Sequence, residues 1–112
     1  MSDHDDQARI VLVSAGSEEQ AETLAHDLVE QRLAACVSVV GGVCSTYRWQ
    51  GQVTRDQEFL LVIKSRAERF EALRDRILEL HSYETPEILA LPVVDGESRY
   101  LEWLRESVEP AD

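Results

Sequence analysis

The sequence contains few cysteines, no long hydrophobic run and half as many basic as acidic residues. Among its 112 residues, 11 Lys or Arg stand against 22 Asp or Glu, for a formal net charge of −11. The surface of such a protein repels a polyanion such as DNA, so we expect no nucleic-acid partner. No apolar stretch approaches the roughly 18 to 20 residues of a membrane-spanning helix, so we expect no membrane insertion.

The two cysteines, Cys36 and Cys44, are too few for a secreted disulfide scaffold. If both lie on one extended strand, their Cα atoms are roughly 25 Å apart, which excludes a disulfide between them. The first residues, MSDHDDQAR, contain neither the basic nor the apolar segment of a secretion signal. We therefore expect reduced thiols and a soluble, cytoplasmic protein.

The length and the 44% hydrophobic content allow one compact core rather than two. Residues 1–7 carry three aspartates and nothing to bury, so we expect a disordered acidic tail there. Residues 8–112 are then expected to form a single domain.

The pattern of apolar residues predicts alternating strands and helices. RIVLVS is typical of a short buried strand, and the capping-box spacing from Ser17 to Gln20 predicts a helix over about 17–33. Two strands, about 35–49 and 52–65, are expected on either side of a tight turn, with a bulge at the paired glycines 41–42. A second helix should follow and end at His81, then a strand in EILALPVV and a final helix in SRYLEWLRES.

The resulting order, βαββαβ plus a C-terminal helix, predicts an α+β fold of the ferredoxin-like, split βαβ type. In this fold two helices cover one face of a four-stranded antiparallel sheet. In EFLLVIK, however, residues on both faces of the strand are apolar, which indicates that the second face is also covered. A hairpin with arms of about 14 residues would also reach roughly 45 Å, beyond its own domain. Both features predict an oligomer.

Individual residues allow more than one interpretation. Cys36 can be a thiol nucleophile or simply a small residue that opens a strand. His81 can cap the preceding helix or, with Glu84 and Glu87, supply ligands to a divalent ion, although no paired-histidine or paired-cysteine motif is present. Tyr83 can serve for packing or for binding, as can the two tryptophans.

Lys64 ends an apolar strand, which places its ammonium group at the edge of a covered surface. A partly buried cation requires a counter-charge, so we expect a carboxylate within about 4 Å, most readily that of Glu58 or Glu87. An ion pair with a purely structural role is the alternative to a functional one.

Four segments resemble the CutA divalent-cation tolerance proteins. They are, in order, RLAACVSVVGGVCSTYRWQGQV, FLLVIKS, HSYETPEILALPV and YLEWL. The resemblance extends over about residues 9–105. It implies a ferredoxin-like subunit, related in architecture to the PII signalling proteins, that forms a homotrimer through interleaved hairpins.

The same resemblance implies a ligand site in clefts between subunits. The family's recurrent polar residues correspond here to Cys36, Trp49, Glu58, Lys64, Tyr83 and Glu87. For members in which copper ligation is suggested, two adjacent histidines and a further cysteine are expected. This chain has Leu80 and Val13 at the other positions, so His81 alone remains as a metal ligand.

The resemblance favours a non-enzymatic homotrimer that responds to divalent metal ions, with Cu(II) or another divalent cation weakly bound. A second reading is a PII-like trimer that senses a small molecule and acts through an unidentified protein partner. A third is an enzyme for an anionic metabolite, with Lys64 and Glu87 as its polar pair.

The N-terminus offers a separate copper site. If Met1 is removed, the chain begins Ser2-Asp3-His4. The terminal amine, two amide nitrogens and the third-position imidazole then provide the square-planar nitrogen set that Cu(II) favours.

Overall fold

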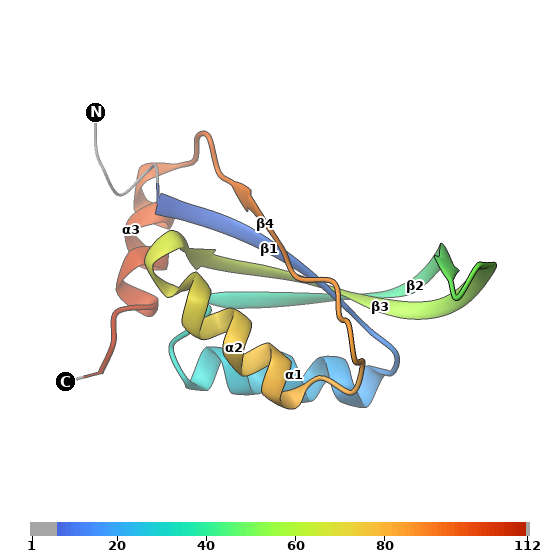
Figure 1. Cartoon of the computed structure of the whole chain (residues 1–112). Helices are drawn as coiled ribbons and strands as arrows, with labels where there is room; N and C mark the ends of the chain where they lie inside the picture. The colour runs from blue at the N-terminus through green and yellow to red at the C-terminus, as the bar shows by residue number, and fades with distance from the viewer. Residues whose placement is uncertain (1–6, 112) are drawn as a thin grey trace.

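The computed structural model describes residues 7–111, which form one antiparallel sheet and three α-helices (Figure 1). The elements in chain order are β1 (Ala8–Ala15), α1 (Glu18–Glu30), β2 (Cys36–Trp49), β3 (Gln52–Arg66), a single 3₁₀ turn (Ala67–Arg69), α2 (Phe70–Leu80), β4 (Leu89–Pro92) and α3 (Ser98–Ser107). The strand order is β2-β3-β1-β4. The ferredoxin-like α+β fold predicted from the sequence is confirmed. The copper motif proposed at residues 2–4 lies outside the described residues, as does most of the proposed tail.

Helix α1 begins as the sequence indicates and ends earlier. The Ser17 side chain accepts a hydrogen bond from the Gln20 N–H, which caps the first turn. The predicted end near residue 33 is wrong because Arg32 has a φ of 60° and leaves the helical conformation. The N–H groups of Leu33 and Ala34 instead turn back to the Leu28 carbonyl.

Strands β2 and β3 form a long hairpin. Its turn consists of Gln50 and Gly51, with φ values of 51° and 80°, as in a two-residue turn that matches the twist of the strands. The pairing shifts between Val40 and Val43, so the predicted bulge at the two glycines is confirmed. The hairpin extends well beyond the rest of the sheet (Figure 1), and the molecule is 47 Å long in that direction.

Helices α1 and α2 lie side by side on one face of the sheet (Figure 1). Val11 and Val13 of β1 and Leu61 and Ile63 of β3 are fully buried against them. From α1, Leu24 and Leu28 enter this core, and from α2, Leu73 and Ile77. Arg76 of α2 donates two hydrogen bonds of 2.8 Å to Asp27 of α1, which joins the helices on their outer side.

The opposite face of the sheet is apolar as well, yet it is incompletely covered. The strand register places side chains from all four strands on this face, which we call the second face: Ile10, Leu12, Val40, Leu60, Val62, Leu89 and Leu91. None of these side chains is buried, and Leu89 is 57% exposed. This finding supports the sequence argument that the face requires a cover.

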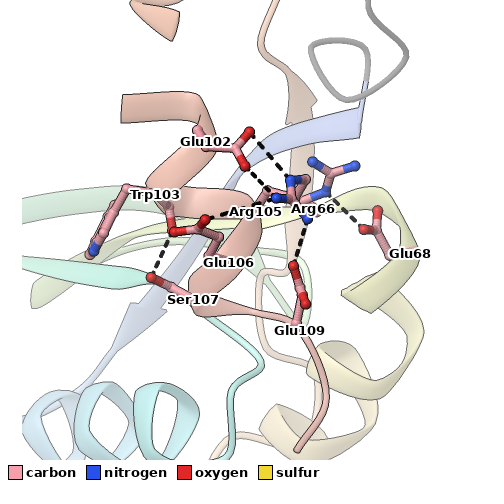
Figure 2. A network of polar contacts seen from close by, with 8 residues as sticks. All are labelled: Arg66, Glu68, Glu102, Trp103, Arg105, Glu106, Ser107 and Glu109. Atoms are coloured by element: carbon pink, nitrogen blue, oxygen red, sulfur yellow. Dashed lines mark hydrogen bonds and ion pairs between the residues drawn. The ribbon is translucent and has the colours of Figure 1, made fainter. Parts of the chain in front are cut away.

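Helix α3 lies across the end of the sheet where β1 begins (Figure 1). Leu101, Leu104 and Val108 form the buried stripe that the sequence predicts. On the outer side of the helix, Arg105 makes ion pairs with Glu102, Glu106 and Glu109 (Figure 2). No helix within residues 7–111 is both long and apolar enough to cross a membrane.

Candidate functional site

A groove of about 580 Å³ lies where the β2–β3 hairpin leaves the sheet and the loop from α2 to β4 passes beside it. Its aromatic lining comes from Tyr47, Trp49 and Tyr83. Its acidic lining comes from Asp56, Glu58, Glu84 and Glu87. The rest of the lining is hydroxyl-bearing, and among residues 7–111 no Lys, Arg or His side chain contributes to it. The groove therefore combines aromatic surfaces with negative charge.

The centre of the groove is a hydrogen bond from the Tyr83 hydroxyl to Glu58 Oε2, 2.6 Å long. Glu58 is only 8% exposed, and on β3 it pairs with Val43, next to the bulge of β2. Burial, followed by the hydrogen bond and the charge of Glu58, raises the pKa of Tyr83 above its ordinary value. The ring passes over Gly16, where an added Cβ would lie 2.9 Å from the Tyr83 oxygen. A glycine at this position thus permits the close approach.

The outer part of the groove lies on the hairpin. Tyr47 donates a hydrogen bond to Asp56 across the two strands, and this bond raises the pKa of the Tyr47 phenol. Trp49, the last residue of β2, remains 51% exposed. Arg48 and Arg55 donate elsewhere, to the Gly51 carbonyl and to Cys44 Sγ. The hairpin therefore directs aromatic rings and a carboxylate toward the groove.

His81 occupies a structural position beside the groove. Its Nδ1 accepts the Tyr83 N–H at 3.0 Å, so Nε2 carries the proton and donates to the Ser14 carbonyl at 2.7 Å. The residue is 8% exposed and also ends α2, where its N–H donates to the Ile77 carbonyl. Both ring nitrogens are thus engaged, which agrees with the capping interpretation and leaves neither free for a metal ion.

Cys36 and Lys64 lie at the other end of the sheet. They face each other across β2 and β3, and Lys64 Nζ is 3.9 Å from Cys36 Sγ and 2.7 Å from Ser38 Oγ. No carboxylate of residues 7–111 is within ion-pair distance of Lys64. The expected pair with Glu58 or Glu87 is therefore wrong within a single subunit, because Lys64 lies further along β3 than Glu58 and beyond the groove.

One subunit thus divides the predicted site residues into two groups. Trp49, Glu58, Tyr83 and Glu87 line one groove, as the sequence suggested, whereas Cys36 and Lys64 do not reach it. Sequence reasoning missed Asp56 and Tyr47 as members of the groove, and it named Glu84 only as a possible metal ligand with His81 and Glu87. The turn at residues 50–51 fixes the hairpin register, which pairs Ser45 with Asp56 and so places Tyr47 diagonally next to that carboxylate.

The described residues do not form a ready metal site. Within residues 7–111, no three His, Cys, Asp or Glu side chains are arranged so that they could hold one metal ion. The two cysteines are both free thiols, as the sequence predicts. A second hollow, of about 650 Å³, lies along the outer side of α1 and is lined by residues of that helix alone, among them Glu19 and Glu22. Its lining among residues 7–111 contains carboxylates but neither tyrosine nor tryptophan.

Comparisons with known proteins agree on one family. The sequence profile described as CutA1 divalent ion tolerance protein matches residues 9–107. A divalent-cation tolerance protein CutA from Thermus thermophilus is 52% identical over 98 residues, which cover 88% of this chain and 95% of that protein. The chloroplastic protein CutA of Arabidopsis thaliana is 42% identical over 98 residues, so this chain covers 54% of that longer relative.

Solved structures give the same result. CutA1 from Oryza sativa superposes with a TM-score of 0.91 at 38% sequence identity, and the match covers 94% of this chain and 96% of that one. A structure described as the periplasmic divalent cation tolerance protein CutA from Archaeoglobus fulgidus superposes with a TM-score of 0.89 at 37% identity, covering 91% and 99% of the two chains.

Proposed function

Because this chain belongs to the CutA1 divalent ion tolerance family, we propose that it is a non-enzymatic homotrimer in the cellular response to divalent metal ions such as copper. We place its ligand site in a cleft between subunits. We also propose a cytoplasmic location, where free thiols such as Cys36 and Cys44 remain reduced. Fractionation of cells by osmotic shock tests the location.

The division of the site residues is the observation that carries this proposal. Trp49, Glu58, Tyr83 and Glu87 line one groove, while Lys64 and Cys36 lie apart, and no carboxylate of residues 7–111 lies beside the ammonium. A hairpin that extends past its own sheet can reach a neighbouring copy, and the apolar second face provides a surface for that copy. Assembly then brings the two groups together and supplies Lys64 with a counter-charge.

The residues present do not fit a tight, preformed copper centre within one subunit. Both nitrogens of His81 are engaged, and no set of three ligands converges among residues 7–111. We therefore propose that Cu(II) or another divalent cation binds weakly, and that tolerance depends on the assembled cleft rather than on storage of metal by one chain.

Growth of a deletion strain on divalent metal salts tests this function. We expect increased sensitivity to Cu(II), restored by the wild-type gene. A gene encoding Val62→Asp, which places a charge on the second face, should fail to restore tolerance. Val94→Asp, at a residue that is 93% exposed, should restore it. A deletion strain that tolerates every divalent cation as well as the parent contradicts the proposal.

The alternative is a PII-like trimer that senses a small molecule and signals through a protein partner. The size of the groove, about 580 Å³, favours this alternative, since it is in the range of small-molecule sites. A screen of metabolites by thermal shift distinguishes the two functions: a metabolite that stabilises the protein more than any divalent cation favours the sensor.

A further inference from the structure

We propose that the groove binds a small organic polycation of the polyamine type, held by its carboxylates and its aromatic rings. This inference rests on the proposed function, because it assigns a ligand class to the cleft proposed there. It requires neither a metal ion nor a catalytic step.

The charge of the groove is not compensated by any basic side chain in the described part of the subunit. Four carboxylates line the groove, and no Lys, Arg or His among residues 7–111 does. Asp56 and Glu58 each accept a hydrogen bond from a tyrosine hydroxyl. A neutral donor of this kind does not cancel the negative charge of the carboxylate. Glu84 and Glu87 have no hydrogen bond or ion pair with any residue in the described part of the chain. Like charges in one concave site repel one another, so a bound cation lowers their free energy.

The negative charge is also evident in the two phenols. The carboxylates next to Tyr83 and Tyr47 contribute to raising the pKa of both groups. A ligand anion in the same groove would meet the same repulsion. If Lys64 of a neighbouring copy entered the cleft on assembly, it would offset only one of the four carboxylates.

The aromatic lining selects an organic cation rather than a bare ion. The hydroxyl groups of Tyr47 and Tyr83 are directed to carboxylates, and the Trp49 ring is half exposed. An ammonium group over the face of such a ring is attracted by the negative charge of the ring face. The methylene chain of a polyamine can contact the rings while its ammonium groups reach separate carboxylates.

A simple metal ion fits the groove less well. No three potential ligands converge within residues 7–111, whereas four carboxylates are distributed around a volume of about 580 Å³. A linear cation with several ammonium groups can contact distributed charges, which a single small ion cannot do.

Calorimetric titration with spermidine tests the inference on the full-length protein. We expect saturable binding with one site per subunit. The double substitution Glu84→Gln and Glu87→Gln should weaken the affinity at least about tenfold through the loss of charge-assisted contacts. The matched control is Glu19→Gln with Glu22→Gln, which removes the same charge from the hollow on α1, whose lining among residues 7–111 includes neither tyrosine nor tryptophan. It should change the affinity less than about twofold, because distant surface charges are screened.

Several outcomes overturn the inference: no saturable binding of spermidine, an equal loss of affinity in both double variants, or displacement of spermidine by an equal concentration of Mg²⁺. Light scattering on the same samples separates this inference from the proposed function. A trimer without spermidine binding refutes the ligand class and leaves the assembly intact. Saturable binding by a monomer, lost only in the groove variant, supports the ligand class and refutes the assembly.

Discussion

Two tyrosine hydroxyl groups donate to carboxylates in the groove, and their surroundings differ. Tyr83 donates to Glu58, which is 8% exposed, whereas Tyr47 donates to Asp56 at the exposed hairpin. A buried carboxylate that loses its donor keeps its desolvation penalty, whereas an exposed one regains water. The same chemical change should therefore have unequal effects at the two positions.

We expect Tyr83→Phe to lower the free energy of unfolding by about 1–3 kcal/mol, because Glu58 is left buried without its donor. Tyr47→Phe should lower it much less, since water can replace the hydroxyl at Asp56. Urea denaturation of both variants measures the difference. Equal losses in the two variants would mean that burial of Glu58 does not govern the strength of this contact.

The Tyr83 pair also predicts a dependence on alkaline pH. The pKa of Tyr83 is raised in the folded protein, so the folded state retains a proton that the unfolded chain loses near pH 10. The protonated Tyr83 hydroxyl therefore contributes fully to the stability of the folded state below about pH 10. This contribution is lost as the pH rises toward the pKa of Tyr83 in the folded protein. The stability of Tyr83→Phe should decline less steeply above pH 10 than that of the wild type.

His81 is expected to act as a structural bridge. His81→Ala removes the acceptor of the Tyr83 N–H and the donor to the Ser14 carbonyl, both in a buried position. We expect a loss of about 1–3 kcal/mol in unfolding free energy. His26→Ala is the control, because the His26 side chain is 79% exposed and should change stability little. An unchanged denaturation midpoint in His81→Ala would contradict the bridging role.

At the scale of the elements, most of the fold could be predicted because its signals are local. Ser17 caps α1, Gln50 and Gly51 make the turn, and the paired glycines make the bulge. The end of α1 could not be predicted, since the left-handed residue there is Arg32, and arginine carries none of the signal that glycine gives at a helix end.

An ion pair adds to the apolar packing between α1 and α2. Asp27 accepts two hydrogen bonds from Arg76, and its side chain is 18% exposed. We expect Asp27→Asn to lower stability by about 1 kcal/mol at neutral pH, near the upper limit for a partly exposed pair. Chemical denaturation measures this change. Asp75→Asn is the control, because Asp75 pairs with Arg74 of the same helix and does not link α1 to α2.

The same pair predicts a dependence on acidic pH. The hydrogen bond from Arg76 lowers the pKa of Asp27 below its ordinary value. The contribution of ionised Asp27 to the stability of the folded state is therefore present above about pH 4. It is lost as the pH falls through the pKa of Asp27 in the folded protein. The difference between wild type and Asp27→Asn should shrink below pH 4. A difference that stays constant down to pH 2 would show that the charge of Asp27 is not involved.

At the scale of the whole molecule, four of the six ligand-site residues that the family resemblance implies lie in one groove of a single chain. Trp49, Glu58, Tyr83 and Glu87 meet because the hairpin and the loop before β4 are neighbours in the fold. Lys64 lies on the same strand as Glu58, but several residues away along it, so strand geometry keeps the two side chains apart. The apolar residues on the second face and the hairpin that extends beyond the sheet indicate a contact between copies of the chain, but no local sequence pattern shows which residues of another copy lie near Lys64.

The last prediction concerns that face. Leu60 and Val62 of β3 lie among apolar neighbours from all four strands, and none of these side chains is buried in the single chain. If three copies cover the face, light scattering at micromolar concentration should give three times the subunit mass of 12.7 kDa. Val62→Asp should reduce this value toward one subunit, because a buried, unpaired carboxylate is strongly unfavourable. Val94→Asp adds the same charge at a 93% exposed position and should leave the assembly unchanged. A wild-type mass of a single subunit would show that the second face is tolerated in water and that the groove functions without a neighbour.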